Sequence, residues 1–218
     1  MLIVCWSWKG GVGTSVSVAG LALSAPSPGS LVVDLAGDQA ALFGLPESDG
    51  PDLSHWLDSV DAPVDGLARL ERAVTDGVSL STGSKGLGVP FERLRLLAEV
   101  LSADSRRVVV DAGRLDPADP LPPLTRALVD RTDQALVVTR ACYLALRNAS
   151  GASPRPTGVI LCVEAGRVLG VDDVAASVGA PVVARVPVEP AIARAVDAGL
   201  LSARPPRGFL RALQPVMA

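Results

Sequence analysis

The chain has 218 residues, of which 49% are apolar, and carries a formal net charge of −3. That length is enough for one α/β domain with a sizeable core. The charge excludes a chain whose whole surface attracts nucleic acid, although a local basic face on a dimer stays open. The three cysteines, Cys5, Cys142 and Cys162, match neither a metal site nor a disulfide framework. No segment has the roughly eighteen apolar residues of a membrane span, so we expect a cytoplasmic protein, at most peripheral to a membrane.

Strand patterns and helical patterns alternate along the chain. Residues 1–6 form an apolar run typical of a buried strand, and a glycine-rich turn and a helix at residues 15–24 follow it. A second apolar run, at residues 30–34, ends in a carboxylate. Beyond it we expect a loop with short helices over residues 35–70, at 53–57 and 64–70, and a short strand at 78–81.

The second half of the chain continues this alternation. Further strands are expected at residues 106–111, 134–139, 157–163 and 181–186, and further helices at residues 91–101, 124–129, 143–149, 171–178 and 191–201. The alternation predicts a doubly wound, mostly parallel sheet flanked by helices, in which ligands bind beyond the carboxyl ends of the strands. We expect one domain over residues 1–203 and a tail over residues 204–218, which could form a short amphipathic helix.

The turn after the first strand, W-S-W-K-G-G-V-G-T-S, is similar to a phosphate-binding loop. Such a loop wraps phosphates with backbone N–H groups, its lysine neutralises phosphate charge, and its hydroxyl residue binds Mg²⁺. Gly10, Gly11 and Gly13 supply the permissive backbone, and Ser15 stands at the hydroxyl position. Thr14 stands where the strict pattern has its lysine, so the standard motif is incomplete.

The run K-G-G-V-G, with a hydroxyl residue two positions further on, resembles the deviant Walker A loop of the ParA/MinD family. The resemblance extends over most of the chain and suggests the MinD-like or TadZ/CpaE-like branch. It implies ATP or ADP and Mg²⁺ as cofactors. In that family, the lysine matched by Lys9 reaches the phosphates of the partner in a nucleotide-sandwich dimer.

Two further segments resemble the switch regions of this family. In S-L-V-V-D-L-A-G-D, Asp34 matches the first carboxylate of the D-x-D pattern, Ala36 replaces the second, and Asp38 follows two residues later. In V-V-V-D-A-G, Asp111 matches the Walker B carboxylate on the magnesium side. The resemblance implies catalytic roles for Lys9, Asp34 and Asp38; magnesium ligation by Ser15, Asp34 and Asp111; and nucleotide contacts from Lys9, Gly10, Gly11, Val12, Gly13, Thr14, Ser15, Pro187, Val188 and Glu189.

The resemblance suggests a nucleotide-dependent dimeric switch that positions or assembles a partner, such as a septum, partition or pilus component. Replacing the loop lysine removes a charge-assisted contact worth roughly 1.5–3 kcal/mol. Together with Ala36, this predicts ATP binding with slow or no hydrolysis. The alternatives are a pseudo-ATPase scaffold that keeps only the fold, and a metabolic α/β enzyme, for which no substrate motif is evident.

Several residues also have simpler interpretations. Lys9 could be a solvated surface residue, Asp34 could cap a loop, and Trp6 and Trp8 could fill the core. A basic face for nucleoid DNA or a partner could be built from Arg114, Arg140 and Arg147, which could equally be scattered charges. In the tail, Phe209, Leu210 and Leu213 could contact a membrane, as in MinD proteins, or could pack on the domain itself.

Overall fold

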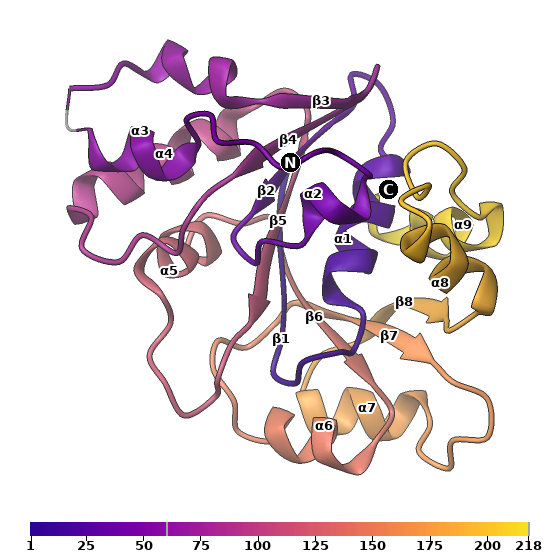
Figure 1. Cartoon of the computed structure of the whole chain (residues 1–218). Coiled ribbons are helices and arrows are strands. Elements are labelled where there is room, and N and C mark those ends of the chain that lie inside the picture. Colours follow the sequence, from indigo (N-terminus) through magenta and orange to yellow (C-terminus); the bar gives the residue numbers. More distant parts are fainter. Residues whose placement is uncertain (60, 218) are drawn as a thin grey trace.

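The computed structural model describes residues 1–59 and 61–217. Within them, eight strands form one central sheet with helices on both sides (Figure 1). The strands are β1 (Leu2–Ser7), β2 (Ser30–Asp34), β3 (Arg72–Thr75), β4 (Val78–Thr82), β5 (Arg107–Arg114), β6 (Gln134–Arg140), β7 (Gly158–Val163) and β8 (Val182–Pro187). Their order is β3-β4-β2-β5-β1-β6-β7-β8, and every neighbouring pair is parallel except β3 and β4. This confirms the predicted doubly wound, mostly parallel α/β fold.

The helices lie in two layers, and each layer buries one face of the sheet (Figure 1). One face is covered by α3 (Leu53–Asp58), α4 (Phe91–Ala103), α5 (Pro123–Val129), α6 (Tyr143–Ala149) and α7 (Val171–Val178). The other is covered by α1 (Thr14–Leu23), α2 (Gln39–Leu42), α8 (Pro190–Asp197) and α9 (Arg207–Met217). A 3₁₀ helix, η1 (Val64–Leu70), precedes β3.

The central strand β1 shows how the sheet joins the two layers. Leu2, Val4 and Trp6 pack into the core on the α4 side, whereas Ile3 and Cys5 pack into the core on the α1 side. All are fully buried, as expected for a central strand whose side chains alternate between two covered faces. This burial makes β1 a rigid base for the loop that follows it.

Three elements differ from the sequence prediction. The edge strand β3 was not expected, because its four residues are only half-buried or exposed and lack an apolar run; it pairs with β4 across the turn at Asp76 and Gly77. The four-residue helix α2 lies in the segment of residues 35–70 where short helices were expected, but its position was not predicted. The predicted helix at residues 191–201 is α8, which ends at Asp197, before Gly199 at φ 64°.

The C-terminal segment forms α9, which packs against α1 and β8. Phe209 and Leu213 have no exposed surface and lie against Gly20 of α1. A methyl group on Gly20 would overlap the Phe209 ring and lie 2.5 Å from Leu213 Cδ1. Of the three side chains considered for membrane contact, two therefore lie inside the molecule, and Leu210 is half-buried. The division into a domain of residues 1–203 and a tail stays a prediction.

Among the described residues, no helix combines the length and apolarity needed to cross a bilayer.

Candidate functional site

The loop between β1 and α1 is shaped by two glycines in the left-handed region. Gly11 has φ 72° and Gly13, which caps the start of α1, has φ 103°, a region that other residues enter only at a cost. A Cβ on Gly13 would also lie 3.3 Å from Cys162 Sγ. The Asn148 side chain donates a hydrogen bond to the Trp8 carbonyl (3.2 Å) and ties the start of the loop to α6.

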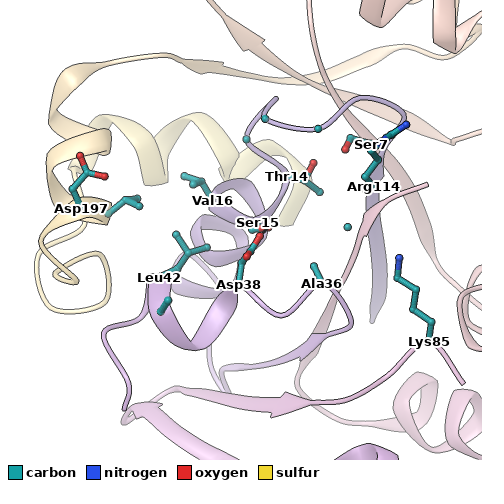
Figure 2. A pocket seen from close by; sticks show the side chains of 16 residues that line it. Ser7, Thr14, Ser15, Val16, Ala36, Asp38, Leu42, Lys85, Arg114 and Asp197 are labelled. Atoms are coloured by element: carbon teal, nitrogen blue, oxygen red, sulfur yellow. Dashed lines mark hydrogen bonds between the residues drawn. The ribbon is translucent and has the colours of Figure 1, made fainter. Parts of the chain in front are cut away.

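A cavity of about 590 Å³ opens beside this loop, where the carboxyl ends of several parallel strands meet (Figure 2). Its size is typical of a small-molecule site. The loop contributes five of the predicted site residues to the lining: Gly10, Gly11, Gly13, Thr14 and Ser15. Further lining comes from the segment after β2, from Lys85 beyond the end of β4, and from the end of β5: Ala36, Asp38, Ala41, Leu42, Lys85, Gly113 and Arg114. The N-terminus of α1, whose free N–H groups favour anions, lies at this cavity.

Asp34, at the end of β2, is 1% exposed and its carboxylate is occupied by backbone hydrogen bonds. Oδ1 accepts from the N–H groups of Ala36 (2.9 Å) and Gly37 (2.8 Å), and Oδ2 accepts from that of Gln39 (2.9 Å). The residue does not line the cavity. These three hydrogen bonds hold the backbone of residues 36–39 in place. This is the geometry expected if Asp34 caps a loop.

Asp111, within β5, is fully buried and does not line the cavity. Its Oδ1 accepts from the Gly113 N–H (3.0 Å), and its Oδ2 accepts from Gln39 Nε2 (2.8 Å). Burial raises the pKa of the Asp111 carboxyl, and the charge of Asp34 adds to the rise, while the side chains of Gln39 and Ser15 and the Gly113 N–H act in the opposite direction. Gln39 Nε2 also donates to the Ser15 carbonyl (2.9 Å), so this fully buried amide joins β5, the α2 segment and the loop.

Asp38 is the carboxylate that faces the cavity directly. Ser15 Oγ donates to Asp38 Oδ2 (3.2 Å), and both residues line the cavity (Figure 2). Mg²⁺ prefers hard oxygen ligands and needs only one or two from the protein when phosphates and water supply the rest. The described residues contain no cluster of three or more His, Cys, Asp or Glu arranged to hold a metal, but the Ser15–Asp38 pair meets this smaller requirement.

Lys9 and the two indoles lie outside the cavity. Lys9 is half-buried and does not line it. Trp6 and Trp8 are buried in the core on the α4 side, with their rings edge to face at 6.2 Å and 74°. The indoles therefore leave the loop open to solvent.

A second cavity, of about 270 Å³, adjoins the first on the side of α8. Its lining includes the predicted contacts Val12, Pro187, Val188 and Glu189, together with apolar side chains of α8 and Cys162. The two cavities share Gly13, Val16, Val196 and Asp197 in their walls. The structure thus brings together an open glycine loop and an adjacent, largely apolar cavity.

Sequence reasoning missed Gln39 and Lys85 and considered Arg114 only for a basic surface face. Lys85 and Arg114 line the larger cavity. In the sequence, the sign that Gln39 belongs to the site is its position one residue after the predicted site residue Asp38. Lys85 follows β4 in a glycine- and serine-containing segment, and nothing near it in the sequence marks a ligand site. Its proximity to the loop arises from the strand order.

No protein-family model and no curated protein sequence matches the chain. Solved structures do match it over nearly its whole length. A ParA family ATPase from Chlorobium tepidum superposes with a TM-score of 0.78 at 19% identity, covering 100% of this chain and 99% of that one. MinD in the MinC:MinD complex of Aquifex aeolicus gives 0.76 at 18% identity, covering 99% and 95%.

Two further matches were solved with nucleotide. MinD from Pyrococcus horikoshii, complexed with Mg-ADP, gives a TM-score of 0.72 at 16% identity, covering 99% of this chain and 93% of that one. A McdA variant from Cyanothece, in complex with ATP, gives 0.65 at 18% identity, covering 98% and 92%. At these identities the likeness establishes the fold: this chain has the fold of the ParA/MinD P-loop ATPases.

Proposed function

We propose that the chain binds ATP in the two adjoining cavities. The observation that carries this proposal is the open loop from Gly10 to Ser15, which lies at the N-terminus of α1 beside a cavity of about 590 Å³. Backbone N–H groups in this position attract phosphates. The adjoining apolar cavity beside Pro187 and Cys162 offers a surface suited to a purine base.

For Mg²⁺ we propose Ser15 and Asp38 as the protein ligands. Their oxygens face the cavity, whereas the carboxylates of Asp34 and Asp111 already accept hydrogen bonds from within the protein. When bound, Mg²⁺ would neutralise phosphate charge. The role of Asp111 would then be to orient Ser15 through Gln39, which contacts both residues.

We further propose that the chain works as a homodimeric, nucleotide-dependent switch in positioning or assembly within the cytoplasm, with a protein partner. Similarity to positioning ATPases, one of them solved as a MinC:MinD complex, supports this. Lys9 does not line the cavity of its own chain, as expected for a residue that contacts the nucleotide bound by a second copy. Hydrolysis should be slow or absent, because Ala36 carries no carboxylate. Nucleoid DNA is a weaker candidate partner, and membrane contact would require α9 to release Phe209 and Leu213.

A scaffold without nucleotide turnover is the second candidate. The observation that favours it is that the carboxylates of Asp34 and Asp111 are both hydrogen-bonded within the protein. Such a protein would keep the fold as an interaction module.

Equilibrium binding of a fluorescent ATP analogue, with and without Mg²⁺, separates the two. We expect saturable binding by the wild type. Gly13→Ala should weaken it by about tenfold or more, because a left-handed alanine costs about 1–2 kcal/mol and distorts the loop. Gly66→Ala is the matched control, since Gly66 lies in η1 without positive φ or close neighbours. No saturation by the wild type would contradict ATP binding and favour the scaffold. Sizing the wild type and Lys9→Ala with and without ATP tests the dimer.

A further inference from the structure

The larger cavity has an unusual source of positive charge. The loop position that holds lysine in the strict phosphate-binding motif is the neutral Thr14, and Lys9 does not line the cavity. The cationic side chains among its lining residues are Lys85 and Arg114, and the acidic ones are Asp38 and Asp197. The positive side chains that a triphosphate in this cavity would meet are therefore those of Lys85 and Arg114.

We propose that Lys85 and Arg114 together bind the terminal phosphate of the nucleotide, in place of the missing loop lysine, and so make the site selective for the triphosphate over the diphosphate. The proposal rests on the proposed function, since it assigns residues within the same site.

The strand order explains how two residues 29 positions apart reach one cavity. Lys85 follows β4 and Arg114 ends β5, and only β2 lies between these strands. The backbone is fixed on both sides, because Leu115 N–H donates to the Ser7 carbonyl (2.8 Å) and Leu124 N–H donates to the Lys85 carbonyl (3.2 Å). Figure 2 shows both side chains on the side of the cavity where Ala36 lies, away from Val16 and Asp197.

Arg114 also lies over the loop itself. Its Cδ is 3.9 Å from the position that a Cβ on Gly10 would take. Its ion-pair partner is Asp116, at 3.3 Å, and the two side chains are 58% and 44% exposed. Exposed pairs of this kind contribute little, so the guanidinium can be recruited by a phosphate. Lys85 forms no ion pair with another described residue.

The relative position of the two cavities gives the direction of the nucleotide. The apolar cavity joins the larger one at Val16, Val196 and Asp197, so a base held there directs its phosphates along the loop. The far end of the larger cavity is formed by Ala36, Gly113, Lys85 and Arg114; Ala36 and Gly113 are close enough that a Cβ on Gly113 would lie 3.1 Å from that of Ala36. The last phosphate of an ATP bound in this direction reaches this end, and the shorter phosphate chain of ADP ends before it.

The test compares ATP, ADP and inorganic tripolyphosphate binding to wild type, Lys85→Met, Arg114→Gln and the double variant. The control is Arg126→Gln, an exposed cation on α5 outside both cavities. We expect the double variant to lose about tenfold to a hundredfold in ATP and tripolyphosphate affinity, as loss of charge-assisted contacts does, and less than about threefold for ADP. Lys85→Arg should retain ATP binding, and equal thermal midpoints would show that the variants are folded.

The outcomes separate the two proposals. Wild type that binds ATP while the double variant binds it equally well, or loses ATP and ADP affinity in the same proportion, overturns the assignment of Lys85 and Arg114 and leaves the proposed function standing. Wild type that binds neither ATP nor tripolyphosphate overturns both.

Discussion

Thr14→Lys restores the lysine of the standard phosphate-binding loop and tests whether the loop still holds phosphate. Thr14 is the first residue of α1 and lines the larger cavity, so a longer side chain there extends into the space beside the loop (Figure 2). A charge-assisted hydrogen bond contributes about 1.5–3 kcal/mol. The variant should therefore bind ATP about ten- to a hundredfold more tightly than the wild type.

Of two opposing effects, the first acts on stability and the second reduces this gain in affinity without reversing it. A cation at a helix N-terminus opposes the helix dipole by about 0.3–1 kcal/mol, which lowers the stability of the free protein but not the contact with phosphate. Lys85 and Arg114 already supply positive charge at the same cavity. The gain should therefore be larger in a Lys85→Met/Arg114→Gln background than in the wild type.

Titration calorimetry with Mg·ATP measures the gain in ATP affinity in both backgrounds. Thr14→Met is the matched control, because it adds a long side chain without charge and should give no gain. Equal ATP affinity for Thr14→Lys and Thr14→Met would refute the reasoning, since it would mean that phosphates do not approach the start of α1.

Two further predictions concern stability. Gly20→Ala should destabilise the protein by up to about 2 kcal/mol in a denaturant titration. Overpacking against the buried Phe209 and Leu213 costs about 1–3 kcal/mol, and the helix-propensity gain of about 1 kcal/mol offsets only part of it. Gly208→Ala, in α9, meets no neighbouring atom and should be neutral or stabilising; a stabilising Gly20→Ala would contradict the packing of α9. The raised pKa of Asp111 means that the folded state binds its proton more tightly than the unfolded state. The stabilisation that comes from this tighter proton binding is present below the unfolded pKa of about 4, and it is lost as pH rises through the folded pKa. Asp111→Asn should therefore gain stability relative to the wild type as pH rises from 4 to 7, and a pH-independent difference would contradict this.

The sequence was sufficient to predict those elements whose structure is determined by their own local residue pattern. Five of the six main apolar runs correspond to the interior strands β1, β2, β5, β6 and β7, because a parallel strand covered on both faces needs a continuous apolar segment. The sixth run is the edge strand β8. The edge strand β3 (R-A-V-T) has no such segment, and only its pairing with β4 makes it a strand. The glycine spacing located the loop, since Gly11 and Gly13 require positive φ.

The rest of the site depends on contacts that the chain order does not reveal. Gln39 reaches Asp111 across 72 residues, and Lys85 reaches the loop only because β4, β2, β5 and β1 are neighbours in that order. The orientation of α9 was likewise open from sequence, because a docked helix and a membrane-binding helix share the same apolar stripe. Its partner, Gly20, lies almost 200 residues earlier.

Equilibrium dialysis against Mg·ATP tests the central claim most directly, namely that the loop from Gly10 to Ser15 holds the phosphates of a nucleotide. The account predicts that wild-type protein retains ATP up to one molecule per chain, and that Gly13→Ala retains far less at the same free concentration. Equal ATP concentrations on the two sides of the dialysis membrane would contradict it, provided that the wild type and the control Gly66→Ala are both folded.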